Sequence, residues 1–272
     1  MKALRIIGAA LVVGALLLVG LPYAAPWLVF RPDRLESADP RRWRVPARQA
    51  AIRAADGSVL SAWWAPPPSA GAPVVLLVHG RSGNIATRAG IVSRLAADGI
   101  GVLAFDYRGY GASEGSASET GIGEDAVSAY DWLLGRGIGS GQIIVIGQSL
   151  GNAPAARLAA LRPVAALVLV SPFASLPEAA ADRLPWLPLL HVPWTRNRFD
   201  VAPHLRTLRL PLLLVVARRD ALVPYEHARR LAASLPRTPH WIEADQSHDG
   251  LLGAALADGR IQAFVRQAAK RR

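Results

Sequence analysis

The fold is decided by nine residues, Ile143-Ile144-Val145-Ile146-Gly147-Gln148-Ser149-Leu150-Gly151. An apolar run with strand composition comes first, a Gly-x-Ser-x-Gly turn follows, and an Ala-rich segment with helix composition begins at Asn152. The chain must reverse so tightly here that a side chain at either glycine would collide with the neighbouring strand or helix. We therefore predict a sharp turn that presents the Ser149 hydroxyl at the tip of a sheet, beside the unpaired N–H groups of a helix start.

Short apolar runs alternate with helix-like segments along most of the remaining chain. Continuous Val, Leu and Ile runs of this length suit strands that are buried on both faces of a parallel sheet. Such strands are expected at residues 74–78, 102–105, 143–146, 166–170 and 212–216, with a last short strand at 240–244. Helices are expected at 91–97, 124–134, 153–161, 226–235 and 251–265. The alternation predicts a doubly wound α/β domain with a mostly parallel sheet.

A hairpin is expected before the parallel strands begin. Residues 49–53 and 59–63 flank Asp56-Gly57, which is a turn dipeptide typical of two-residue hairpin loops. The two segments therefore predict a pair of antiparallel strands at the start of the domain.

One stretch breaks the alternation, between Phe173 and Leu208. It has no strand-like run, and it contains five prolines together with Trp186 and Trp194. An insertion of this length inside a compact domain is usually functional, and its Trp and Leu content argues against a disordered linker. We predict a short lid over the site at about residues 173–208.

The N-terminal segment from Ile6 to Phe30 is almost wholly apolar and carries no charge. It is long enough to cross a lipid bilayer as a helix. We therefore predict an N-terminal transmembrane anchor at residues 1–30, followed by a catalytic domain at residues 31–272. The protein is then expected at the membrane as a single-pass protein.

A cleaved signal peptide is the alternative interpretation of this segment. Its best small-residue cleavage candidate, Ala24-Ala25, has Pro or Tyr at the −3 position and Pro after the cut, so the site is poor. The membrane orientation stays open, because Lys2 and Arg5 favour a cytoplasmic N-terminus whereas the arginines between residues 31 and 44 favour the reverse.

The net charge of +11 comes almost entirely from arginine, since the only lysines are Lys2 and Lys270. Dense basic patches lie at residues 41–48 and 270–272. They fit attraction to an anionic membrane surface, and equally a solvated face of an arginine-rich protein. No helix-turn-helix, zinc-finger or RNA-binding signature accompanies them, so we expect no nucleic-acid partner.

The absence of cysteine excludes disulfides and thiolate metal sites. The oligomeric state stays open.

A serine nucleophile needs a base and an acid. His248 follows the last expected strand and Asp220 follows the strand at 212–216, so both should lie at the sheet edge that also carries Ser149. An imidazole can take the serine proton, and a carboxylate fixes the imidazole tautomer and stabilises the imidazolium. We predict Ser149 as nucleophile, Asp220 as acid and His248 as base, with Asp245 as the reserve acid.

The loop after the first parallel strand reads His79-Gly80-Arg81-Ser82-Gly83-Asn84. We predict an oxyanion hole formed by the backbone N–H groups of Arg81 and Leu150. His79 has no carboxylate or histidine partner at ligand spacing, so we expect neither a metal site nor a cofactor. Asp106, at the end of a strand, is expected to fix its own loop through Arg108 or through the backbone.

Five segments together resemble the α/β-hydrolase superfamily: Leu76-Leu77-Val78-His79-Gly80-Arg81-Ser82-Gly83-Asn84, Phe105-Asp106-Tyr107-Arg108-Gly109-Tyr110-Gly111-Ala112-Ser113-Glu114-Gly115, Gly147-Gln148-Ser149-Leu150-Gly151, Ser171-Pro172-Phe173-Ala174-Ser175 and Asp220-Ala221-Leu222-Val223-Pro224. The resemblance extends from residue 51 to about residue 252. It is greatest to membrane-anchored serine hydrolases of the palmitoyl-protein thioesterase and serine aminopeptidase types. The Tyr-Arg-Gly-Tyr-Gly block is specific to this branch, whereas the serine pentapeptide occurs throughout the superfamily.

The resemblance implies the α/β-hydrolase fold and the same roles for Ser149, Asp220, His248, Arg81 and Leu150. The chain departs from the branch at two positions, where Arg81 and Asn152 replace the usual Asn and Gly. A backbone oxyanion donor survives either change. The Arg81 side chain is a candidate for selecting anionic substrates.

These features predict a membrane-anchored serine hydrolase that cleaves a carboxylic ester or thioester through an acyl-enzyme. The apolar lid and the anchor favour a small-molecule, acyl or lipid-like substrate. One alternative is a serine aminopeptidase-type peptidase, in which Glu178 and Asp182 of the lid would hold the substrate amine. The other is a non-catalytic binding module on the hydrolase scaffold.

Overall fold

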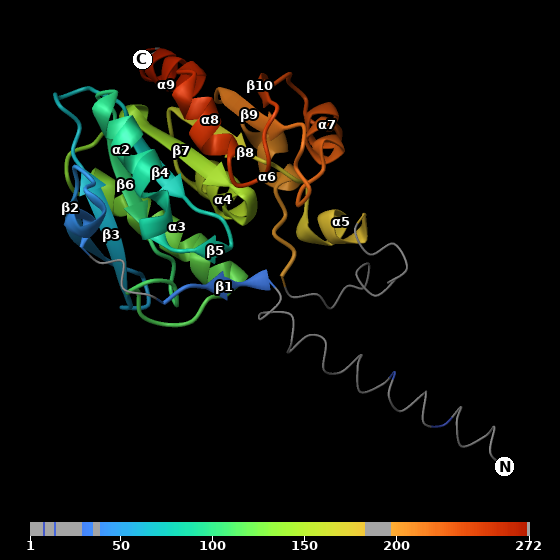
Figure 1. Ribbon diagram of the computed structural model, residues 1–272, viewed down its shortest axis with the longest axis horizontal. Helices are drawn as coiled ribbons and strands as arrows, with labels where there is room; N and C mark the ends of the chain where they lie inside the picture. Colours follow the sequence, from blue (N-terminus) through green and yellow to red (C-terminus); the bar gives the residue numbers. More distant parts are fainter. Residues whose placement is uncertain (1–7, 9–13, 15–28, 35–38, 183–196, 271–272) are drawn as a thin grey trace.

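The structure is a computed structural model that describes residues 8, 14, 29–34, 39–182 and 197–270. Within these residues an eight-stranded sheet runs through the molecule, and helices cover both of its faces (Figure 1). Its strands are β2 (Arg48–Arg53), β3 (Val59–Ala65), β4 (Val74–Val78), β6 (Gly101–Phe105), β7 (Ile143–Gln148), β8 (Ala166–Val170), β9 (Leu212–Ala217) and β10 (His240–Ala244).

The strand order is β10-β9-β8-β7-β4-β6-β3-β2. β3 is antiparallel to β2 and β6, and all other neighbouring strands are parallel. Every residue of β4, β6, β7 and β8 is buried, as the uninterrupted apolar runs predict. The expected hairpin is confirmed as β2 and β3, with Gly57 in the turn at φ +90°. All parallel strands therefore end at one edge of the sheet.

Two hydrophobic cores lie on the two faces of the sheet. One includes buried residues of α3 (Glu119–Leu134), α4 (Asn152–Leu161), α6 (Ala202–Thr207) and α7 (Tyr225–Ala233). The other includes α2 (Ala89–Ala97), α8 (Leu251–Ala257) and α9 (Arg260–Ala269). The remaining elements are α5 (Leu176–Ala181), β1 (Arg31–Pro32), β5 (Ser82–Gly83) and the short helices η1 (Pro40–Trp43), η2 (Ile85–Arg88), η3 (Ser140–Gln142) and η4 (Ser149–Gly151). Helices on both faces fix a doubly wound domain.

Two helix predictions differ from the structure. The single closing helix expected at residues 251–265 is two helices, because Gly259 adopts φ +77° and the Asp258 carboxylate caps Arg260 N at 3.0 Å. α3 begins at Glu119 rather than at residue 124. The Ser118 hydroxyl caps its first turn by accepting from Gly121 N, which starts the helix despite the glycines that weaken its sequence signal.

The predicted lid segment, residues 173–208, is described at both of its ends. α5 lies in its first part and α6 in its last, whereas residues 183–196 lie outside the described residues. The two ends are joined by backbone hydrogen bonds, from Leu176 N to Arg198 O and from Val201 N to Ala174 O, each 2.8 Å long. The chain therefore leaves the domain and returns to it at adjacent points.

The expected membrane anchor lies almost wholly outside the described residues. Across the part of the chain that the structure describes, no helix has the length and apolar character needed to cross a membrane. Phe30, the last residue of the expected anchor, is buried, and its ring packs edge-on against that of Phe199 in the predicted lid segment, with the ring centroids 5.8 Å apart.

Candidate active site

The Gly-x-Ser-x-Gly turn has the strained geometry that its sequence predicts. Ser149 directly follows β7 and adopts φ +52°, a left-handed conformation that is rare for a side-chain-bearing residue. A Cβ added at Gly147 would lie 2.8 Å from Ala155 Cβ, and one added at Gly151 would lie 2.3 Å from Val78 O. Both glycines are therefore required, one by the following helix and the other by the adjacent strand.

Helix α4 is tied to the end of the neighbouring strand through its first residue. Leu150 is buried at the start of the helical segment, where the backbone N–H groups have no intrahelical acceptor. The fully buried Asn152 side chain donates from Nδ2 to Val170 O at 3.0 Å and to Ser171 O at 3.1 Å. Asn152 therefore fixes the turn relative to the carboxyl end of β8, which a glycine at this position would not do.

Asp220 and His248 are in direct contact. They lie in the loops after β9 and β10, which are adjacent parallel strands. His248 Nδ1 is 2.7 Å from Asp220 Oδ2, and the other carboxylate oxygen accepts from Leu222 N at 2.8 Å and Val223 N at 2.7 Å. Both residues are buried. The carboxylate is thus held by three hydrogen bonds, which fixes the orientation of the imidazole.

The charge state of Asp220 follows from these contacts. Burial by itself would raise the pKa of the Asp220 carboxyl, but the hydrogen bonds from His248 and from Val223 N outweigh burial and hold that pKa below its ordinary value. Asp220 is therefore ionised at neutral pH and acts as an acceptor, so His248 Nδ1 carries the proton in this hydrogen bond.

Ser149 lies at the same edge of the sheet as this pair. β7, β8 and β9 are consecutive parallel strands, so the loops after them emerge side by side. The structure thus joins Asp220 to His248 and places Ser149 at the same edge, after β7.

Three other candidate carboxylates have different partners. The reserve acid Asp245 is 72% exposed at its side chain and forms an ion pair of 2.8 Å with Arg219. Glu178 and Asp182, considered for amine binding, both pair with Arg230, at 3.2 Å and 2.6 Å. Among the described residues, no group of three or more His, Asp or Glu side chains is placed to hold a metal ion.

The loop after β4 packs directly against the serine turn. A Cβ added at Gly80 would lie 3.3 Å from Gln148 O and 3.4 Å from Ser149 Cβ. The Gly80 carbonyl accepts from His79 Nδ1 at 2.7 Å. In a trans peptide the C=O and the following N–H point in opposite directions. The His79 ring therefore fixes the direction of the Arg81 N–H.

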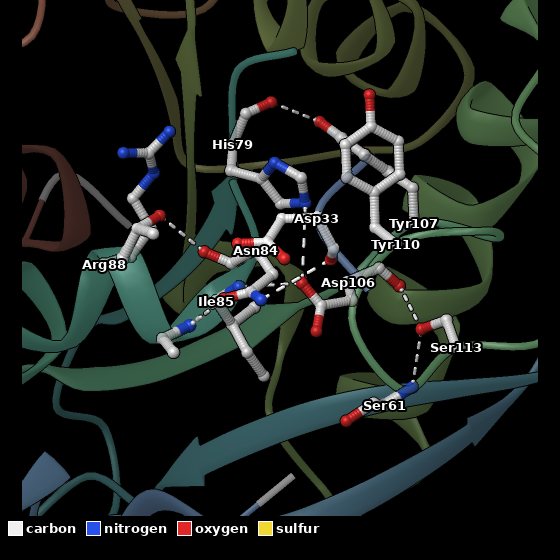
Figure 2. Close-up of polar contacts among 12 residues, drawn as sticks. Asp33, Ser61, His79, Asn84, Ile85, Arg88, Asp106, Tyr107, Tyr110 and Ser113 are labelled. Carbon is white, nitrogen blue, oxygen red and sulfur yellow. Dashed lines mark hydrogen bonds and ion pairs between the residues drawn. The ribbon is translucent and has the colours of Figure 1, made fainter. Parts of the chain in front are cut away.

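The loop after β6 holds this same segment at three points, two of which Figure 2 shows. The Tyr107 hydroxyl donates to His79 O at 2.6 Å. The Tyr110 hydroxyl donates to Arg81 O at 2.8 Å. The Asp106 carboxylate accepts from Ile85 N at 2.7 Å. Two hydroxyls and a carboxylate from one short block thus fix both ends and the middle of the loop.

The chain just after the expected anchor adds a fourth contact. β1 pairs in parallel with β5, and Arg31 N donates to Arg81 O at 3.2 Å (Figure 1). The contact lies within the loop predicted to form the oxyanion hole. Residues 31 and 32, which directly follow the expected anchor, are therefore hydrogen-bonded to this loop.

Comparisons with known proteins decide the family. A family model described as alpha/beta hydrolase fold matches residues 73–204, and one described as TAP-like protein matches residues 193–271. An uncharacterised protein of Mycobacterium tuberculosis is 36% identical over 216 residues, which are 79% of this chain and 75% of that protein. The chain belongs to the α/β-hydrolase superfamily.

One further relative of this α/β-hydrolase carries the name of an enzyme, and a solved esterase has a similar fold. The chain is 33% identical over 180 residues to lysophosphatidylserine lipase ABHD12 of Danio rerio, a match of 58% of this chain and 46% of the lipase. An esterase of Pyrococcus furiosus has a similar structure, with a TM-score of 0.71 and 21% identity over 88% of this chain and 98% of the esterase. That structural likeness shows the fold, and the family supports a hydrolase.

The sequence of this hydrolase did not indicate the contacts by which the loop after β6 holds the loop after β4. Asp106 was expected to fix its own loop through Arg108 or the backbone, and its backbone oxygen accepts from the Ser113 hydroxyl of that loop at 2.7 Å. Its carboxylate, however, holds the backbone of the loop after β4. Arg108 instead pairs with the buried Asp125 at 2.7 Å. The tyrosines of the Tyr-Arg-Gly-Tyr-Gly block marked the family, but their contacts depend on β6 lying beside β4. Nothing in the sequence pattern indicates which carbonyls their hydroxyls reach.

We expect His79 to act as a positioning residue for the oxyanion loop. Burial lowers its pKa to about 3, so the ring is neutral throughout the working pH range and donates from Nδ1 to Gly80 O. His79→Leu removes that donor and should lower kcat by up to about 10²-fold, the effect of losing one oxyanion donor, with little change in KM. His79→Asn, which restores an N–H donor, should recover part of the loss. A normal kcat in a stably folded His79→Leu protein would contradict this role.

Proposed function

We propose that the protein is a serine hydrolase that cleaves a carboxylic ester or thioester through an acyl-enzyme. Ser149 is the nucleophile, His248 the general base and Asp220 the acid that orients the imidazole. The 2.7 Å hydrogen bond between His248 Nδ1 and Asp220 Oδ2 carries the proposal, because it lies at the edge of the sheet where the strained Ser149 turn ends.

The proposed chemistry follows from the proton positions. Asp220 accepts the Nδ1 proton of His248, which leaves Nε2 as the acceptor for the Ser149 hydroxyl proton. The serine oxygen then attacks the acyl carbonyl, and the N–H groups of Leu150 and Arg81 stabilise the negative oxygen of the tetrahedral intermediate. His248 returns the proton to the departing alcohol or thiol. A water that is deprotonated by His248 then releases the acid and restores the serine.

The proposed substrate is a small molecule with an acyl or lipid-like group. The apolar composition of the predicted lid segment and of the predicted anchor at residues 1–30 supports this class, because both would favour a substrate that resides in or near a membrane. A relative, lysophosphatidylserine lipase ABHD12, is named for its action on a lipid. The anchor belongs to the same proposal.

Ester cleavage is favoured over peptide cleavage by the charges of the predicted lid. A peptidase that removes N-terminal residues needs a carboxylate available for the substrate amine. Glu178 and Asp182 both pair with Arg230 instead. We therefore expect turnover of acyl esters to exceed turnover of aminoacyl amides.

Labelling of the full-length protein with a fluorophosphonate tests the proposal. The probe should modify Ser149, as located by peptide mass spectrometry, and the labelled protein should stay in the membrane pellet after an alkaline carbonate wash. Hydrolysis of 4-nitrophenyl esters should accompany the labelling. An unlabelled, inactive but folded protein would support the non-catalytic alternative, and faster turnover of aminoacyl amides would support the peptidase. Release of the labelled protein by the wash would contradict the anchor alone.

A further inference from the structure

Arg88 lies beside the proposed nucleophile. It is the last residue of η2, the short helix that follows the loop after β4. The point at which a Gly80 Cβ would lie is 3.4 Å from Ser149 Cβ and 3.9 Å from Arg88 Nη2. The serine and the guanidinium therefore flank the same glycine. Figure 2 shows the guanidinium directed away from Asp106 and its neighbours.

The Arg88 guanidinium has few partners. Its Nε is buried and has no hydrogen-bond partner, and its Nη2 makes one long contact of 3.4 Å with Ser82 O. Arg108 and Arg230 show the contrast, since each forms close ion pairs with carboxylates. No carboxylate of residues 29–34, 39–182 or 197–270 forms an ion pair with Arg88.

A charged guanidinium at this position lowers the stability of the fold. Burial lowers the pKa of Arg88, and the charges of Asp249 and Asp106 oppose burial only in part. The group nevertheless stays protonated, because arginine keeps its charge in proteins. Removing a charge from water without a paired opposite charge is unfavourable for folding. A ligand that supplies negative charge would compensate this cost.

We propose that Arg88 binds an anionic oxygen group of the substrate, so that the hydrolase prefers acyl substrates that carry a phosphate or carboxylate near the scissile bond. The planar guanidinium suits such groups because its N–H donors match their oxygens in pairs. The inference deepens the proposed function and rests on it. It also moves anion selection from Arg81, the residue that the sequence suggests, to Arg88.

The selectivity between matched substrates tests this role. One pair is 4-nitrophenyl hydrogen succinate against 4-nitrophenyl butyrate, and the other is a lysophosphatidic acid against the monoacylglycerol with the same acyl chain. The wild-type kcat/KM should be higher for the anionic member of at least one pair. A preference within the succinate pair indicates a carboxylate, and a preference within the lysophosphatidic acid pair indicates a phosphate. Arg88→Gln should lower the anionic-to-neutral ratio of that pair by about tenfold or more, as expected for a lost charge-assisted hydrogen bond.

Three further variants control the experiment. Arg88→Lys keeps the charge and should retain part of the preference. Arg229→Gln makes the same change at an exposed arginine of α7 and should leave the ratio unchanged. Arg81→Gln should also leave it largely intact. A wild-type preference for the neutral esters, an unchanged ratio in Arg88→Gln, or a loss confined to Arg81→Gln would overturn the proposal.

A binding measurement separates this inference from the proposed function. At constant ionic strength, inorganic phosphate should raise the melting temperature of the full-length protein, of Ser149→Ala and of Arg229→Gln, but not that of Arg88→Gln. This readout needs no turnover, so it stands even if no ester is cleaved. Equal shifts with and without Arg88 would overturn anion binding at Arg88, and the absence of a shift in all of these proteins would overturn binding of a phosphate group there. Absence of fluorophosphonate labelling would overturn only the hydrolase.

Discussion

Ser149→Ala is expected to lower kcat for 4-nitrophenyl ester hydrolysis by about 10⁶-fold, the loss that follows removal of a serine nucleophile from an acting triad. The alanine side chain cannot form the acyl-enzyme, and the rest of the site cannot replace that covalent step. The serine turn should persist, because the substitution removes only the hydroxyl. Purified protein with its predicted anchor, held in detergent, is assayed for turnover and for its melting temperature.

The control is another serine, on a helix that packs against α4. Ser128 lies in α3, and its hydroxyl bonds only to Glu124 O of the same helix. Ser128→Ala should leave kcat within about twofold of the wild-type value, because the Ser128 hydroxyl bonds to its own helix and not to the candidate site. Retained ester turnover in Ser149→Ala would show that another group is the nucleophile.

Gly151→Ala is expected to reduce the free energy of unfolding by more than about 4 kcal/mol, which places it among the largest single-residue effects. The added Cβ would lie 2.3 Å from Val78 O and 2.4 Å from His79 O. Both oxygens belong to the backbone at the end of a fully buried central strand, so neither can move aside. Urea denaturation followed by tryptophan fluorescence measures the loss, and low yield of folded protein would be its first sign.

Gly253 provides the matched control for this steric argument. It lies inside α8, and a Cβ added there meets nothing within 4 Å. Gly253→Ala should therefore stabilise the protein by up to about 1 kcal/mol, because alanine favours the helix over glycine. Equal stability of Gly151→Ala and Gly253→Ala would show that the serine turn can accommodate a Cβ at Gly151, which would contradict the steric argument.

The sheet could be predicted almost residue by residue. The strands expected at residues 74–78, 166–170 and 240–244 are β4, β8 and β10 with the same bounds. Uninterrupted runs of Val, Leu and Ile carry a strong local signal, because a strand covered on both faces admits almost no polar residue. Helix bounds were less accurate. The start of α3 was missed because its first turns contain glycines, which weaken the helix signal. The break between α8 and α9 was missed because it depends on the φ of one residue, Gly259.

The pairing of Asp220 with His248 was also foreseen, because their loops follow adjacent parallel strands. Chain order and strand order were enough for that prediction. The partners of Arg108, Glu178 and Asp182 were not foreseen. Arg108 reaches Asp125, and Arg230 reaches Glu178 and Asp182 in the predicted lid segment. These contacts depend on how the helices lie across the sheet.

The sequence by itself determined the fold class, the strained serine turn and the candidate residues at one edge of the sheet. These features are encoded locally, in hydrophobic runs, in two glycines and in the order of short motifs. Only the tertiary structure decided how Tyr107, Tyr110 and Asp106 hold the loop after β4, and that the unpaired Arg88 lies beside Ser149. Such contacts join segments from different loops, so they exist only once the strands have taken their places in the sheet.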